Sequence, residues 1–339
     1  MTYMSETGSS VTGGYPTGAW RPSGPLRMTR GRWVVLALAV PVALALIGWA
    51  GFSLVSSFAK GSYPFSYAVP VDHGQVAVNV NAGDVTLRPG PGRAARLTGT
   101  VQYGLVRPGI SESATATGVD VSVNCDGVTS SNCGMNATLD APARTAVTLW
   151  SNGGNIGVSG FSTGVTLSAG GGNVTASNLA GGLNLDTGGG DLTSTGLAGP
   201  MQISTEGGNV TASSLDGSMR IDTGGGDLNA NGLTGDLQLS TEGGNVDSDG
   251  VASQQVFVQS GGGDVTLSFT QPPQDLHITA DGGNVTVILP PGGTRYDIST
   301  PDTQGGNVTL PRPTVLSSAS HDTITVDSGG GDITITQAG

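Results

Sequence analysis

The chain has 339 residues, of which 58 are glycine, 11% are charged and 5% are aromatic, and its formal net charge is −12. Glycine at more than twice its usual share of roughly 7% excludes a coiled coil and disfavours a helical enzyme, because each glycine costs about 1 kcal/mol against alanine inside a helix. The negative charge disfavours a nucleic-acid partner, since Lys and Arg must neutralise the phosphates of such a partner.

The first 59 residues predict a tail followed by a membrane anchor. Residues 1–32 are rich in Gly, Ser, Thr and Pro without periodicity, which is typical of a disordered segment. Residues 33–59 carry no charge, and about 20 apolar residues suffice to cross a bilayer as a helix. We therefore expect a single-pass membrane protein with its transmembrane helix at 33–59.

The charges that flank this segment predict its orientation. Lys60 alone follows closely, whereas four arginines precede it: Arg21, Arg27, Arg30 and Arg32. The positive-inside rule then places the N-terminus in the cytoplasm and the C-terminal domain outside the cell membrane. A cleaved signal peptide is the alternative, with Ser57 and Ala59 suited to cleavage, but the apolar run exceeds the roughly 7–15 residues of a signal peptide.

Residues 60–144 alternate apolar and polar residues without a regular period. The alternation is clearest in QVAVNVNAGDVTL and GVDVSVNC, which indicates strands. Because a solenoid needs atypical terminal units to cover its open end, we interpret 60–144 as an irregular β cap at the N-terminal end of a repeat domain.

Residues 145–339 repeat the motif Gly-Gly-(Asn/Asp)-apolar. The first six copies are spaced by 18 residues and the later ones by 19, 20, 23 and 25, while NAGDVTL places Asp84 in the same role. A fixed period of this kind indicates stacked structural units. The Asn or Asp of each copy is Asn155, Asn173, Asp191, Asn209, Asp227, Asn245, Asp264, Asn284, Asn307 and Asp332.

Aligning the 18-residue copies produces four aliphatic columns, and the first two lie two residues apart, as in a strand. Glycine accepts φ > 0, so the Gly-Gly pair predicts a corner between two short strands in each coil. The sequence thus predicts an all-β parallel β-solenoid with about 18 residues per coil. The columns begin at Val147, Leu149, Ile156 and Phe161 and recur at Val165, Leu167, Val174 and Leu179 and in the later copies.

Two better-known solenoids fit less well. A hexapeptide left-handed β-helix needs an aliphatic residue every six positions, whereas these columns fall at offsets of 0, 2, 9 and 14. A calcium-binding β-roll needs tandem G-G-x-G-x-D-x-U-x nonapeptides, and the second half of each coil lacks that motif.

Stacking the coils brings the Asn and Asp residues of the motif into one column. Two aspartates at ~4.8 Å would repel by about 3.5 kcal/mol at an effective dielectric of ~20, and the alternation of Asn and Asp from Asn173 to Asp264 keeps aspartates two coils apart. We interpret the column as a structural ladder. A cation site and catalytic carboxylates are the alternatives, and we expect no metal, cofactor or catalytic residue.

The two cysteines, Cys125 and Cys133, flank a turn signal, and outside a membrane such a pair predicts a disulfide that closes a hairpin loop. A metal pair is the poorer alternative, because no histidine is adjacent. The histidines His73, His277 and His321 are scattered and predict no nucleophile triad.

The run from Pro142 to Val158 and the repeated GGGNVT and GGGDLT resemble the bacterial putative-adhesin family, formerly catalogued as a domain of unknown function. The resemblance covers about residues 65–339. It implies a glycine-cornered β-solenoid that acts as a non-enzymatic adhesin or envelope-polymer-binding scaffold. The implied partners are a cell-wall or surface glycan or another surface protein.

Two other functions remain open at the level of sequence. An envelope-stress or signalling accessory protein would sense with its ectodomain and report through its tail. A carbohydrate-active β-helix enzyme would carry acids clustered in a cleft, away from the regular ladder.

Overall fold

The structure, a computed structural model, describes residues 39–49, 61–69, 71, 73–81, 83–104, 107–114, 118–124, 133–292, 294–300, 303, 305–311 and 322–339. The chain divides into two compact units, Met1–Val55 and Ser56–Gly339, and each is described by itself.

In the first unit, residues 39–49 form a helix inside the predicted membrane segment. Over the described residues, no helix has both the length and the apolar character needed to span a bilayer. The rest of segment 33–59 and the tail 1–32 lie outside the described residues, so the transmembrane helix and the tail stay predictions.

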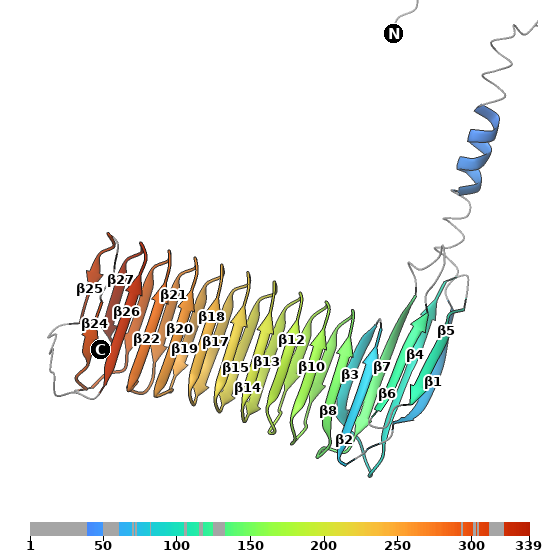
Figure 1. Ribbon diagram of the computed structural model, residues 1–339, viewed down its shortest axis with the longest axis horizontal. Coiled ribbons are helices and arrows are strands. Elements are labelled where there is room, and N and C mark those ends of the chain that lie inside the picture. Colours follow the sequence, from blue (N-terminus) through green and yellow to red (C-terminus); the bar gives the residue numbers. More distant parts are fainter. Residues whose placement is uncertain are drawn as a thin grey trace, which may run out of the picture. The chain divides into compact units, whose positions relative to one another are not determined.

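The described part of the second unit folds into two β-sheets that lie face to face along a rod (Figure 1). The 14-stranded sheet has the spatial order β1 (Gly61–Val69), β4 (Ala95–Tyr103), β7 (Gly134–Ala141), β3 (Asp84–Pro89), β9 (Ile156–Ser159), β11 (Val174–Ser177), β13 (Leu192–Ala198), β15 (Val210–Asp216), β17 (Leu228–Thr234), β19 (Val246–Val251), β21 (Val265–Phe269), β23 (Val285–Leu289), β27 (Ile333–Gln337) and β25 (Val308–Thr309).

The 13-stranded sheet forms the opposite layer. Its spatial order is β24 (Asp297–Ser299), β26 (Thr323–Ser328), β22 (Asp275–Ala280), β20 (Gln255–Ser260), β18 (Leu237–Thr241), β16 (Met219–Thr223), β14 (Met201–Thr205), β12 (Leu183–Thr187), β10 (Val165–Ala169), β8 (Ala146–Ser151), β2 (Gln75–Val80), β6 (Gly118–Asn124) and β5 (Gly109–Ala114).

One coil is a strand of the 13-stranded sheet, a glycine corner, a strand of the 14-stranded sheet and a second turn. Consecutive coils pair in parallel with the predicted register, as where Val165 lies between Val147 and Leu183, and Val210 lies between Leu192 and Leu228. The all-β parallel solenoid with 18-residue coils is therefore confirmed.

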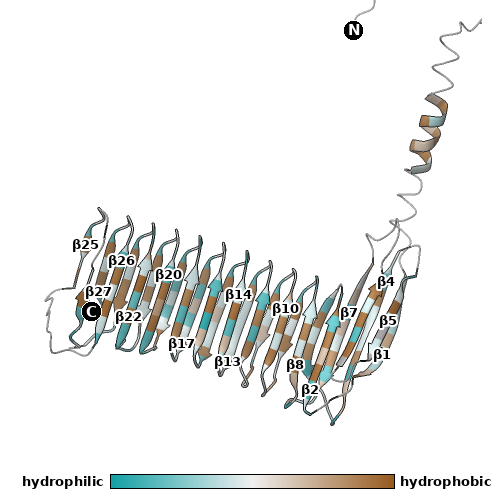
Figure 2. Cartoon of the chain, viewed as in Figure 1, coloured by the Kyte–Doolittle hydropathy of each residue, from teal (hydrophilic) through white to brown (hydrophobic). Residues whose placement is uncertain are grey.

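The core is a continuous aliphatic stack between the two sheets. Inward and outward residues alternate along each strand, so that hydrophobic and polar colours alternate in Figure 2. All four predicted columns are buried, and each buried Val, Leu or Ile contributes roughly 1.5–3 kcal/mol relative to exposure.

At both ends of the rod the order of coils departs from the order of the chain. The coil β2–β3 lies between β8–β9 and the coil β6–β7, while β26–β27 lies between β22–β23 and β24–β25. Antiparallel pairs β1–β4, β4–β7 and β5–β6 complete the N-terminal end. The segment 60–144 is thus only partly irregular, because it contributes two further coils to the stack.

Candidate functional site

The Asn and Asp residues of the glycine corners form one hydrogen-bonded column on the outside of the rod. The side-chain Oδ1 of each residue accepts a hydrogen bond from the backbone N–H of the next, as from Asn209 to Asp191 at 2.9 Å and from Asp227 to Asn209 at 2.9 Å. In spatial order the column runs Asp84, Asn155, Asn173, Asp191, Asn209, Asp227, Asn245, Asp264, Asn284, Asp332, Asn307.

The column works through a single acceptor oxygen, which Asn and Asp both possess. This explains why either residue fits the position. The last two members stand in reverse chain order because the coil β26–β27 lies between β22–β23 and β24–β25. No two aspartates are adjacent in the spatial order, so like charges stay two coils apart. The Oδ1 atoms from Asp84 to Asp332 each accept a backbone N–H, which supports the interpretation of the column as a structural ladder.

A second polar column, absent from the sequence-based predictions, lies inside the corner. A Thr or Ser four residues before the ladder residue is buried and bonds to the corner backbone, as where the Thr223 hydroxyl donates to the Gly226 carbonyl at 3.1 Å and Ser260 donates to Gly263 at 2.8 Å. The signal was present as a hydroxyl at a fixed offset in most copies of the motif.

Among the described residues, Cys133, His73 and His277 lie at separate elements, directly before β7, in the turn before β2 and within β22. Cys133 is disulfide-bonded, but Cys125 lies outside the described residues, so their pairing stays a prediction. His73 has a positive φ of 48° in an exposed turn, and His321 lies outside the described residues. His277, by contrast, belongs to the groove described next.

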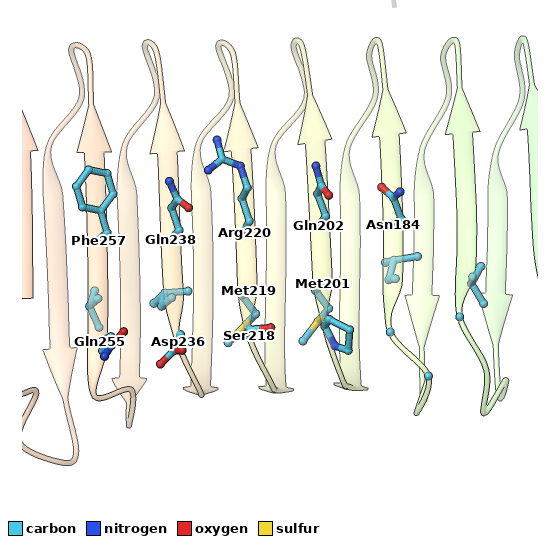
Figure 3. Close-up of a pocket in the computed structure, with 18 of the residues that line it drawn as sticks. Asn184, Met201, Gln202, Ser218, Met219, Arg220, Asp236, Gln238, Gln255 and Phe257 are labelled. Carbon is cyan, nitrogen blue, oxygen red and sulfur yellow. The ribbon is translucent and has the colours of Figure 1, made fainter. Parts of the chain in front are cut away.

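A groove of about 700 Å³ crosses the outer face of the 13-stranded sheet from β10 to β22. One wall of the groove, which we call the outward row, consists of one outward-facing residue from each strand. This is the second residue of β10, β12, β14, β16 and β18 and the third residue of β20 and β22. Figure 3 shows much of this row. The outward row consists of Thr166, Asn184, Gln202, Arg220, Gln238, Phe257 and His277.

The opposite wall, the turn row, comes from residues at the start of the same strands. Its early members are small, which leaves the hollow, and its later members are polar. The turn row consists of Gly164, Gly182, Pro200, Ser218, Asp236, Gln255 and Asp275, and beneath the two rows lies the buried column that contains Met201 and Met219 (Figure 3).

The groove runs across the strands and therefore along the rod. Its seven strands are six steps of ~4.8 Å, a length of about 29 Å. A trough of this length with a thin apolar floor and polar walls fits an extended, repetitive ligand better than a compact one.

The groove contains one aromatic pair and few charges. Phe257 is 38% exposed and stacks on His277, with ring centroids 5.2 Å apart and an interplanar angle of 20°. Arg220 is paired with Asp222, Nε to Oδ2 at 2.8 Å, while the carboxylates of Asp236 and Asp275 remain in the turn row. Among the described residues, no group of three or more His, Cys, Asp and Glu side chains could hold a metal ion.

The family model described as Toastrack DUF4097 matches residues 69–336. No curated protein matches the chain. Similar solved structures are a putative cell adhesion protein from Clostridium sporogenes (12% identity, 82% of this chain and 100% of that chain, TM-score 0.23), a putative adhesin from Bacteroides fragilis (14%, 82% and 97%, 0.35) and a putative adhesin from Parabacteroides distasonis (11%, 84% and 98%, 0.32).

Proposed function

The chain belongs to the Toastrack DUF4097 family, and we propose that it is a non-enzymatic scaffold of the cell surface. The scaffold binds an extended partner of the envelope in the groove of the 13-stranded sheet. The observation that carries this proposal is the groove itself, which crosses seven stacked strands and is lined by regularly spaced polar side chains.

The proposal includes a membrane anchor at residues 33–59, with the N-terminus in the cytoplasm and the solenoid outside the cell. Its support is the uncharged run of 27 residues, the four preceding arginines and the helical conformation of residues 39–49. An anchored rod would present its groove to polymers or proteins near the membrane.

Protease treatment of intact cells tests the anchor and its orientation. Digestion should remove the chain after residue 60 and leave the cytoplasmic tail protected, as detected with separate tags at the two ends. Recovery of the full-length chain in the soluble cytoplasmic fraction would refute the topology.

A binding screen tests the scaffold function. Residues 60–339 are incubated with purified cell-wall fractions, surface glycans and intact cells, and the bound fraction is compared with that of a double variant, Gln202→Ala with Gln238→Ala. The expected result is binding to at least one envelope fraction that the double variant weakens. Equal binding by both proteins would remove the groove from the proposal.

Glycoside cleavage is the second candidate function, because two carboxylates share the turn row. The backbones of Asp236 and Asp275 are two strand steps apart, about 9.6 Å, just above the roughly 6.5–9.5 Å that separates the carboxyl groups of inverting glycosidases. Both side chains are exposed, however, whereas a general acid is usually kept protonated by burial. The test is the release of reducing sugar from a bound glycan. If the parent releases sugar and Asp236→Asn does not, the chain is an enzyme and the scaffold proposal is wrong.

A further inference from the structure

We infer that the groove binds an uncharged β-1,4-linked polysaccharide whose chain lies parallel to the rod, with one sugar ring on the Phe257–His277 pair. This inference rests on the proposed scaffold function and names the class of polymer and its direction.

The direction follows from the repeat of the groove. Each strand contributes one residue to each wall, so equivalent side chains recur every ~4.8 Å along the rod. A β-1,4-linked pyranose chain is extended and advances by a similar distance per sugar. A ligand along the rod therefore meets about one coil per sugar, whereas a ligand along a strand would cross the groove and leave it within one or two sugars.

The hydrogen-bonding capacity of the walls matches sugar hydroxyls. Within the described part of the chain, the amides of Asn184, Gln202, Gln238 and Gln255 form no hydrogen bond with other protein groups. The ladder residues of the glycine corners differ, because their Oδ1 atoms accept backbone N–H groups. An amide offers both a donor and an acceptor, and a hydroxyl accepts one bond and donates another. Asn184 and Gln202 lie one coil apart in the outward row, and Gln238 lies two coils beyond Gln202. Gln255 adds a fourth amide from the turn row, so amides face sugar hydroxyls at several points along the groove.

The aromatic pair supplies the apolar contact that a pyranose ring needs. Phe257 stacks on His277 of the neighbouring strand β22, and 38% of the Phe257 surface is open to solvent. Among described residues after residue 60, the other exposed aromatic ring is Trp150, 46% exposed, which lies on the same sheet but outside the groove. Trp150 therefore provides a matched control for any effect of removing an exposed ring.

The charges of the groove disfavour an acidic polymer. The guanidinium of Arg220 is already paired with Asp222, while Asp236 and Asp275 add unpaired negative charge to the turn row of a chain whose net charge is −12. A polyuronate or a phosphate-rich polymer would meet repulsion from these two carboxylates at the β18–β22 end of the groove. An uncharged polysaccharide avoids this cost.

The test uses the full-length chain in detergent and measures its depletion on insoluble cellulose and chitin, with polygalacturonate as the acidic probe. The expected result is depletion on a neutral polymer and none on polygalacturonate. Phe257→Ala should weaken the neutral binding about tenfold, the loss expected for one aromatic contact, and Trp150→Ala should bind like the parent.

Soluble oligosaccharides test the direction. Affinity for cello- or chito-oligomers should rise steadily from the dimer to the hexamer, because each added sugar reaches another coil. A plateau at the dimer would overturn the parallel orientation.

The remaining outcomes separate this inference from the proposed function. Neutral binding that Phe257→Ala leaves unchanged, or binding to polygalacturonate alone, overturns the inference and leaves the scaffold function in place. Binding to intact cells or to a surface protein without any affinity for neutral polysaccharide has the same meaning. Failure to bind any envelope fraction or polymer overturns both.

Discussion

Gly190 shows why the corners of this chain require glycine. It has a φ of +95°, and a Cβ at this position would overlap the carbonyl oxygen of Gly172, the equivalent residue of the neighbouring coil. The same overlap arises at Gly208, whose φ is not in the left-handed region. The close approach of stacked backbones, rather than φ alone, therefore fixes the residue before the ladder as glycine.

The adjacent glycine provides a matched control for this requirement. A Cβ on Gly189 would meet nothing within 4 Å. We expect Gly190→Ala to lower the free energy of unfolding by at least ~2 kcal/mol, from backbone strain and steric overlap, and Gly189→Ala to change it by less than about 0.5 kcal/mol. Denaturant unfolding of both variants measures the difference, and similar midpoints would show that the corner can relax.

Two serines in one buried column should respond in opposite ways to replacement by alanine. The hydroxyl of Ser194 is fully buried and finds no hydrogen-bond partner among the described residues, whereas Ser248 donates to the carbonyl of Ala230 at 2.7 Å. Ser194→Ala should stabilise the rod by about 1 kcal/mol and Ser248→Ala should destabilise it by a similar amount, because only the second change breaks a bond. Thermal melting distinguishes the two, and a lower melting temperature for Ser194→Ala would indicate a bound water.

At the scale of the strand, inward and outward positions should differ sharply in tolerance. Val210 is fully buried between Leu192 and Leu228, whereas Thr211, one residue along β15, is exposed. Val210→Asp should cost several kcal/mol by burying an unpaired charge, and Thr211→Asp should stay within about 0.5 kcal/mol. Equal melting temperatures for the two variants would contradict the assigned register.

The strands and their columns could be predicted from the sequence because the period is fixed. Once copies are aligned by the Gly-Gly-(Asn/Asp) motif, residues such as Leu192 and Val210 fall in one apolar column, and strand alternation assigns their direction. The ladder residues follow from the same alignment.

The groove could not be predicted in this way, because its walls share no residue type. Asn184, Gln202, Arg220, Gln238 and Phe257 occupy one column but look like an ordinary exposed face in the sequence. The hollow depends on small residues such as Gly182 and Ser218 at the strand starts, and their effect appears only when the coils are stacked.

At the scale of the whole solenoid, the sequence also could not predict that coils at both ends are stacked out of chain order. Asp84 lies 71 residues before Asn155, its neighbour in the ladder, because β4 to β7 intervene in the chain. Alignment of adjacent copies finds neighbours about 18 residues apart and has no means of finding such distant pairs.

The exchanged coil at the C-terminal end makes a testable prediction. Strands β24 and β25 pair only with β26 and β27 among the described strands, so deletion of residues 322–339 should release residues 294–311 as well. Limited proteolysis of the shortened chain should then cut within 294–311, while the parent resists. Continued protection of that segment would mean that β24 and β25 can pair directly with β22 and β23.

The direction of the backbone hydrogen bonds has a mechanical consequence. Bonds between coils point along the rod, so a pull applied to its two outermost coils loads every coil boundary in series, and the boundary with the fewest bonds yields first. The shortest pairings, three residues for β24 with β26 and two for β25 with β27, make that end the expected point of rupture. The residues of a released coil would extend while the boundary between the next two coils stays paired. The rod would therefore lengthen stepwise under tension instead of breaking at once.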